Sequence, residues 1–254
     1  MTKPIGPIPA GFSADSDGML LIGGRRADAL VAEAGTPLFA YDLKSVAAKA
    51  ALFREHFDDV DLHFAVKANP YTAILQRMLK LVDGFDLASG GELETAIAAG
   101  AAPRTMSIAG PGKRDAELEA AIRHGVTINL ESEGEAGRAL AIAERLDVTP
   151  RLAVRVNPDF EIKGSGMRMG GGAKPFGVDA ERVPALVRTI LDASADWQGF
   201  HIFAGSQALS ADALILWDAM RSLRQKGELW QPSFKLKRGG AKPRASRRRA
   251  STAD

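Results

Sequence analysis

Short runs of β-branched and aromatic residues alternate with Ala-rich stretches of helical periodicity from about Pro37 onward. This alternation limits the fold more than any other feature, because it is typical of βαβ units built around a parallel sheet. The predicted strands are Leu62–Val66, Gly84–Ala88, Thr105–Ala109, Val126–Leu130, Leu152–Val156 and Gly199–Phe203. The predicted helices are Tyr71–Val82, Gly91–Ala99, Arg114–His124, Ser132–Leu146 and Ala180–Ala193. Each strand run is apolar enough for burial on both faces, which favours a parallel α/β barrel over an antiparallel sandwich.

The number of strands makes this barrel incomplete. A closed (β/α)8 barrel needs eight strands, and about six are found before the pattern stops near Met220. We therefore expect an N-terminal segment over residues 1–36, a partial (β/α)8-type parallel barrel over residues 37–220, and a basic tail without a packed core over residues 221–254. A further short strand, Thr36–Tyr41, is predicted outside the barrel.

Composition narrows the class of protein. The 254 residues suffice for one α/β barrel of about 250 residues. The hydrophobic fraction of 46% and the charged fraction of 25% are typical of folded globular proteins. The sequence has no cysteine, which excludes disulfides, thiolate metal sites and a cysteine nucleophile and favours the cytoplasm. No metal site is predicted. The first residues contain no apolar run long enough for a signal segment or a membrane span, so no membrane association is expected.

Charge divides the chain into two regimes. Residues 1–220 carry 22 basic and 29 acidic residues, a net of −7, and residues 221–254 carry 11 basic and 2 acidic residues, a net of +9. The basic run Lys235–Arg249 could neutralise nucleic-acid phosphates. A solvated tail is the more ordinary interpretation, because no base-reading module accompanies it, so a nucleic-acid partner is not expected.

Polar side chains stand where the predicted strands end, which is the edge that carries the chemistry in barrels of this class. Lys67 follows the first strand within Phe64–Pro70. A lysine is ordinarily exposed and without function. Partial desolvation at a strand end would instead favour the neutral amine that attacks an aldehyde. The glycine-dense stretch Gly164–Gly177 is predicted to be a rim loop over this edge.

The second and fifth strands each contain a charged residue. Asp86 lies beside buried positions, where an unpaired carboxylate is costly, so a cationic partner such as Lys67 is expected. Ser89 and Glu92, just after it, are explained by capping of the next helix. Arg155 is a stronger signal, because a guanidinium is seldom placed in a buried strand without an anionic or ring-oxygen partner. Structural and functional roles for Arg155 are equally supported.

The remaining strands add polar groups at the same edge. The fourth strand leads to Asn129 and Glu131, and the sixth contains His201 and leads to Gly205 and Ser206. A strand histidine is more often a core residue, but an imidazole can also stack on an aromatic cofactor ring. A backbone N–H of Gly205 and the hydroxyl of Ser206 can donate to a phosphate. Each motif is weak alone, and their order along one barrel favours a cofactor site.

These residues, in this order, resemble the fold-type III pyridoxal-phosphate enzymes, which include diaminopimelate, ornithine and arginine decarboxylases and are related to alanine racemase. The resemblance runs from about Pro37 to Gln207 and rests on Phe64–Pro70, Phe85–Leu93, Arg155–Pro158 and His201–Gln207. The sequences of residues 157–177 and 201–207 are most similar to those of the branch associated with exosortase and exopolysaccharide gene clusters.

The resemblance implies pyridoxal 5'-phosphate (PLP) as the cofactor and decarboxylation of an amino acid, in the manner of diaminopimelate decarboxylase. Lys67 would hold the cofactor as an imine and later protonate or position the carbanionic intermediate, with Asp86 paired near it. Arg155 would lie close to a cofactor oxygen, His201 would stack on the ring, and Ser206 would bind the phosphate. The cofactor supplies the electron sink, and the protein supplies burial and orientation. A homodimer is expected from the family.

Several family features are missing after the histidine strand. The glycine-triplet phosphate loop, the Glu-Pro-Gly-Arg strand end and the C-terminal β-domain are not found, and Gly239–Gly240 is only a faint echo of the triplet. The interpretation is a C-terminally truncated or frame-shifted member of the family. The alternative is a non-catalytic PLP-binding or partner-binding remnant, which binds the cofactor or a protein partner without turning over a substrate.

Overall fold

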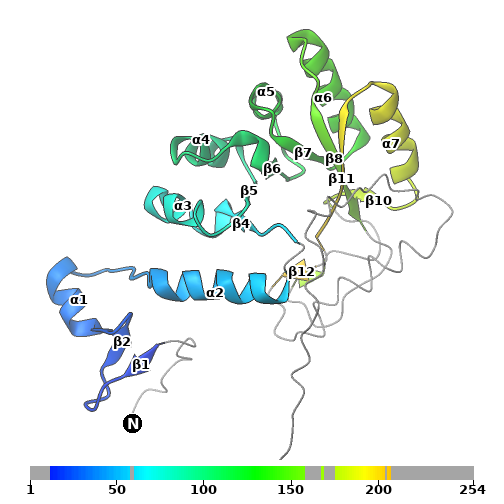
Figure 1. The fold of residues 1–254 in the computed structure, drawn as a ribbon. Coiled ribbons are helices and arrows are strands. Elements are labelled where there is room, and N and C mark those ends of the chain that lie inside the picture. The colour runs from blue at the N-terminus through cyan, green and yellow to red at the C-terminus, as the bar shows by residue number, and fades with distance from the viewer. Residues whose placement is uncertain (1–11, 58–59, 158–166, 169–174, 204, 207–254) are drawn as a thin grey trace, which may run out of the picture. The chain divides into compact units, whose positions relative to one another are not determined.

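The computed structural model describes residues 12–57, 60–157, 167–168, 175–203 and 205–206 (Figure 1). By its internal contacts the chain divides into two compact units. The first comprises residues 1–85 and 95–105, and the second comprises residues 86–94 and 106–254.

The first unit begins with a small antiparallel sheet and two helices. Its elements are β1 (Ser13–Ala14), β2 (Leu20–Ile22), β3 (Arg25–Arg26), α1 (Ala27–Ala34) and α2 (Leu43–His56). Helix α2 starts at Asp42, whose Oδ1 accepts from the Lys44 N–H at 2.9 Å and whose Oδ2 accepts from the Ser45 hydroxyl at 2.6 Å. Neither helix was predicted from the sequence.

The short strand predicted at Thr36–Tyr41 is wrong. These residues connect α1 to α2 without any strand or helix assignment. The aromatic and proline pattern was weak evidence for a strand, because a strand forms only where a neighbouring strand accepts and donates the ladder hydrogen bonds. In addition, Pro37 has no N–H to donate.

The first unit continues with β4 (His63–Ala65), the 3-10 turn η1 (Val66–Ala68), α3 (Thr72–Met78), the start of β5 (Gly84–Leu87) and the 3-10 turn η2 (Pro103–Thr105). Asp83 fixes the entry to both strands. Its Oδ2 accepts from the Leu62 N–H and from Arg54, each at 2.7 Å. Gly84 is required by close packing, because a Cβ there would lie 2.0 Å from the carbonyl oxygen of Thr105.

The second unit contains most of the parallel sheet. Its further strands are β6 (Met106–Ile108), β7 (Thr127–Leu130), β8 (Arg151–Asn157), β10 (Val178–Asp179) and β11 (Asp196–Ile202). The β6–β7, β7–β8, β8–β10 and β8–β11 pairs are all parallel. The strand order of the sheet is β10-β8-β7-β6-β5-β4, with β11 pairing with β8. The two-residue strands β9 (Met167–Arg168) and β12 (Gly205–Ser206) form a separate antiparallel pair.

The core of the second unit lies between this sheet and its helices. Helices α5 (Asp115–His124), α6 (Glu133–Leu146) and α7 (Val183–Asp192) follow its strands, as Figure 1 shows, and α4 (Gly90–Ala98) follows β5. Residues at helical spacing face inward, such as Leu118, Ala121 and Ile122 of α5. Residues 152–157 of β8 are all buried, which confirms the expectation of strands covered on both faces.

The predicted α/β class with a parallel sheet is confirmed. All six predicted strands and all five predicted helices are present, with ends displaced by up to four residues. Strand β11 starts three residues early, because Asp196 already hydrogen-bonds to Pro150 and pairs with Arg151. Strand β10 was not predicted. The basic tail at residues 221–254 and most of the glycine-dense stretch lie outside the described residues. Within the described ranges, no helix is long and apolar enough to cross a membrane.

Substitution of a sheet core residue tests this packing. Leu152 of β8 is fully buried, whereas Leu191 of α7 is 51% exposed. We expect Leu152→Ala to lower the free energy of unfolding by about 2–5 kcal/mol, because it leaves a cavity in a closely packed sheet. Leu191→Ala is the matched control and is expected to cost less than about 1 kcal/mol. Urea unfolding followed by circular dichroism measures both, and equal losses would contradict the described core.

Candidate functional site

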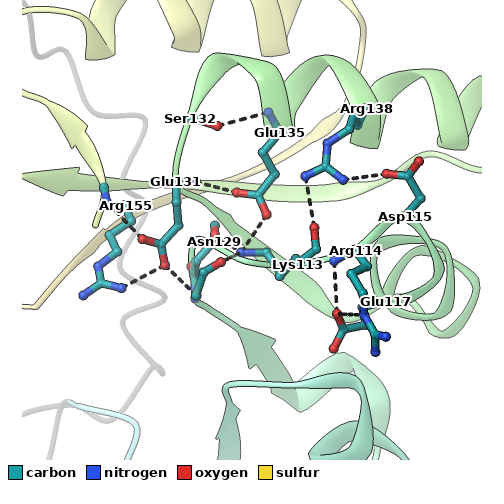
Figure 2. Close-up of polar contacts among 12 residues, drawn as sticks. Lys113, Arg114, Asp115, Glu117, Asn129, Glu131, Ser132, Glu135, Arg138 and Arg155 are labelled. Carbon is teal, nitrogen blue, oxygen red and sulfur yellow. Dashed lines mark hydrogen bonds and ion pairs between the residues drawn. The ribbon is translucent and has the colours of Figure 1, made fainter. Parts of the chain in front are cut away.

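A buried carboxylate, Glu131, organises the carboxyl edge of the sheet in the second unit (Figure 2). It directly follows β7 and is 5% exposed. Its Oε1 accepts from the Gly110 N–H at 2.5 Å and from Nη1 of Arg155 at 2.8 Å, and its Oε2 accepts from the Gly177 N–H at 2.9 Å. The acid therefore ties together the segment after β6, the strand β8 and the segment before β10.

Glycine is needed at both backbone donors to Glu131. Gly110 has a φ of +120° and Gly177 a φ of +76°, conformations that residues with a Cβ rarely adopt. A Cβ on Gly177 would also lie 3.0 Å from the carbonyl oxygen of Arg155 and 3.1 Å from the backbone nitrogen of Asn157. This close approach brings the Gly177 N–H within reach of the acid.

A second buried ion pair lies beside the first. Lys113, which is 4% exposed, forms an ion pair with Glu135 at 2.8 Å, and its Nζ donates to the carbonyl oxygens of Gly110 and Asn129. Glu135 in turn accepts from the Glu131 N–H at 2.7 Å. The four buried charges thus comprise two acids and two bases, which is how a protein interior can hold them.

Arg155 is held on several sides within the second unit. Its guanidinium binds Glu131 and lies over the ring of Phe176, 4.8 Å from the ring centroid, and 5.5 Å from that of Phe203. The side chain is only 8% exposed. The expectation that a strand guanidinium needs an anionic partner is correct, and that partner is Glu131.

His201 lies next to Arg155 on the neighbouring strand. The two residues are paired in the parallel register of β8 and β11, so their side chains project to the same face. Burial lowers the pKa of His201, and the Arg155 guanidinium lowers it further, while Asp86 and Glu131 oppose this shift. Its Nδ1 is buried and has no hydrogen-bond partner among the described residues.

Asp86 is bound by a hydroxyl of the next strand. It lies in β5 between the buried residues Phe85 and Leu87, and its Oδ1 accepts from the Ser107 hydroxyl at 2.9 Å. The helix caps predicted just after it are confirmed. The Ser89 hydroxyl accepts from the Glu92 N–H at 3.2 Å, and the Glu92 carboxylate accepts from the Ala88 N–H at 2.7 Å.

Lys67 belongs to the first unit, and the pairing with Asp86 stays a prediction. Lys67 lies in the 3-10 turn that follows β4 and is exposed, so the partial desolvation expected from its place after a strand is not observed. The 3-10 turn places Lys67 two residues beyond the end of β4. Gly205 and Ser206 form strand β12, paired with β9, and their predicted phosphate role also stays a prediction.

Glu131 was predicted to lie at a strand end but without a role, and Lys113 was not predicted as a site residue. The available signal was the position of Glu131 directly before the helix-capping Ser132. The equivalent position before Ser89 holds Ala88, so capping alone does not require an acid there. The burial of Lys113 results from contacts with two other segments, which no local pattern encodes.

The residues at this edge suit an aromatic ring compound with polar atoms. A buried imidazole nitrogen without a partner and a guanidinium stacked on a phenyl ring are groups that can contact an aromatic ligand and its oxygen atoms. Within the described ranges, no group of three or more carboxylate or imidazole side chains could hold a metal ion. The imidazole of His201 and the guanidinium of Arg155 fit PLP, as the resemblance implies.

Comparisons with known proteins identify the family to which this chain is similar. Residues 43–234 match the family described as "Pyridoxal-dependent decarboxylase, pyridoxal binding domain". The chain is 35% identical over 179 residues to a diaminopimelate decarboxylase of Deinococcus radiodurans, covering 70% of this chain and 45% of that protein. It is 30% identical over 183 residues to an L-glutamyl-[BtrI acyl-carrier protein] decarboxylase of Niallia circulans, covering 71% and 43%. The chain thus spans a little under half the length of these relatives.

A solved structure shows the same similarity. The crystal structure of diaminopimelate decarboxylase from Helicobacter pylori complexed with L-lysine superposes with a TM-score of 0.66 at 27% sequence identity. The match covers 79% of this chain and 53% of that chain.

Titration of His201 tests the electrostatics of this edge. Because its pKa is lowered in the folded state, the neutral imidazole is favoured, and one histidine signal is expected to titrate below the ordinary value of about 6.5. Stability from this group is complete above that value and is lost as pH falls through the folded pKa, since the unfolded chain binds the proton more tightly. NMR titration measures the midpoint.

The assignment of that signal uses two variants. His201→Gln is expected to remove the signal with the lowered midpoint, and His124→Gln, at an exposed position of α5, is expected to keep it. A His201 signal with a midpoint at or above 6.5 would contradict the buried environment.

Proposed function

The chain belongs to the pyridoxal-dependent decarboxylase family, and from this premise we propose that it binds PLP as the cofactor-holding part of an amino acid decarboxylase. One observation carries the proposal beyond family membership. Arg155 and His201 are paired on adjacent parallel strands, and the buried Nδ1 of His201 has no partner among the described residues. A buried polar atom without a partner is costly in a folded protein unless a ligand satisfies it.

The proposed roles follow the chemistry of each side chain. When bound, PLP supplies the electron sink for loss of carbon dioxide from an amino acid. Lys67 would hold the cofactor covalently through its ε-amino group, and Asp86 would pair near it. His201 would cover a ring face, and Arg155 would donate to a ring oxygen. Gly205 and Ser206 would donate to the phosphate. Six residues are thus proposed to contact the cofactor.

The proposed substrate is a diamino acid. Support comes from the diaminopimelate decarboxylase relatives and from the relative whose structure contains L-lysine. Another relative acts on an L-glutamyl group attached to a carrier protein, so members of this family differ in substrate. Because the chain covers 45% of the first relative, turnover by this chain is itself part of the proposal.

A narrower proposal places the chain in the branch associated with exosortase and exopolysaccharide gene clusters. Its support is the sequence of residues 157–177 and 201–207. Exopolysaccharide genes beside the coding sequence would support this branch, and lysine-biosynthesis genes there would count against it. The cytoplasmic location and the homodimer also stay predictions.

A second candidate function is cofactor binding without turnover. Its support is that the matched residues cover 45% and 43% of two decarboxylase relatives and correspond to the pyridoxal binding domain. The two candidates share the cofactor site and differ in whether a substrate is consumed.

Covalent capture of the cofactor tests the proposed function. Mixing the purified chain with PLP is expected to give a visible absorption band, and borohydride is expected to fix the cofactor on the peptide that contains Lys67. Lys67→Arg should abolish this fixation, because a guanidinium does not form the bond. Lys80→Arg, at an exposed lysine of the same unit, is the matched control and should retain it. Peptide mass spectrometry locates the fixed group.

The remaining outcomes separate the two candidates. Release of carbon dioxide from diaminopimelate identifies a decarboxylase, and binding without release identifies the non-catalytic alternative. Fixation spread equally over several lysines, or retained in the Lys67 variant, would refute the proposed site.

A further inference from the structure

We propose that Glu131 is a positioning residue of the cofactor site, which fixes the guanidinium of Arg155 at the carboxyl edge of the sheet. This inference rests on the proposed function and assigns a role to a residue outside the six proposed to contact the cofactor. Glu131 acts through Arg155 and not on the cofactor itself.

The geometry of Glu131 leaves it few other roles. Both oxygens accept hydrogen bonds, from the backbone of Gly110 and Gly177 and from Arg155, at 2.5 to 2.9 Å. Its side chain is 2% exposed, so solvent does not compete for these contacts. A carboxylate whose oxygens already accept three hydrogen bonds is poorly suited to take a proton or attack a substrate, but it is well suited to hold a cation in place.

A comparison inside the chain separates this role from helix capping. The β5–α4 and β7–α6 junctions share the pattern Ser-x-x-Glu. The serine accepts from the glutamate N–H at 3.2 Å at both junctions, and the glutamate accepts from the N–H of the residue before the serine at 2.7 Å at both. That preceding residue is Ala88 at the first junction and Glu131 at the second. The caps form equally well without an acid there, so the Glu131 carboxylate is not needed to start α6.

The backbone of Glu131 is held as firmly as its side chain. Its N–H donates to Glu135, and Glu135 is paired with the buried Lys113, which donates to the carbonyl oxygen of Gly110. The backbone of Glu131 is therefore held in place by contacts that do not involve Arg155. On the other side, Phe176 lies under the guanidinium. Arg155 is thus confined between a fixed anion and an aromatic ring.

The reactivity of Arg155 toward phenylglyoxal tests the positioning directly and needs no cofactor. Glu131→Gln keeps the shape of the side chain. It places an amide NH₂ group, which is a donor, against the N–H groups that donate to Glu131. We expect this substitution to raise the rate of Arg155 modification by about tenfold or more. Tenfold corresponds to the lower end of the free energy lost with a hydrogen bond to a charged group. Peptide mass spectrometry measures the rate. An unchanged rate would overturn the proposal.

A double-mutant cycle on PLP affinity tests the link to the site. We expect Glu131→Gln to weaken PLP binding by about tenfold, and Arg155→Met, which removes the guanidinium, to weaken it at least as much. If Glu131 acts through Arg155, the double variant should bind like Arg155→Met alone, to within about twofold. Losses that multiply would mean that Glu131 only braces the fold, and the proposal would fail.

Two further variants keep the test decisive. Glu117→Gln is the matched control, because Glu117 also joins two segments by accepting from the Gly90 and Arg114 N–H groups, at 2.8 and 3.0 Å. It should change neither Arg155 reactivity nor PLP affinity by more than about twofold. If Glu131→Gln does not fold, Glu131→Asp, which keeps the charge but is too short to reach all three donors, takes its place with the same expected directions.

The two proposals fail in different ways. An unsubstituted chain that does not bind PLP would refute the proposed function, and the phenylglyoxal rates would still decide whether Glu131 fixes Arg155. A chain that binds PLP, with Arg155 equally unreactive in both Glu131 variants, would leave the function standing and refute the positioning role.

Discussion

A buried negative charge must be satisfied by donors, and in this protein the carboxylate of Glu131 imposes that requirement on a whole edge of the sheet. The donors come from the segment after β6, from β8 and from the segment before β10. Removing Arg155 would leave that charge uncompensated in a buried place, which costs several kcal/mol. The relative positions of these segments are therefore set by one side chain more than by any loop's own preference.

The character of the candidate site follows from this constraint. Arg155 is buried because Glu131 neutralises it, and His201 pairs with Arg155 in the register of β8 and β11. Burial and the adjacent guanidinium then favour the neutral imidazole. A histidine that would titrate near neutral pH in water thus has a lowered pKa at this edge. Lys113 and Glu135 add a second neutral pair, so the edge holds four charges without a net excess.

Local patterns predicted the regular part of the fold well. The apolar runs predicted every strand from β4 to β8, and the helical spacing of alanine and leucine predicted the helices between them, because the period of the apolar residues reflects which face of an element is buried. The prediction failed where structure depends on a partner. Thr36–Tyr41 had strand-like residues but no neighbouring strand, and β10 exists only because residues 178–179 pair with the end of β8.

The sequence by itself determined the α/β class, the order of strands and helices, the family, and the residues with suitable chemistry, among them Lys67, Arg155 and His201. These properties reside in composition, periodicity and short motifs. Only the tertiary structure decided which charges are buried and which groups meet. Glu131 and Lys113 look like surface residues in the sequence. They are buried because segments distant in the chain enclose them. Desolvation is a property of that enclosure and not of any residue type.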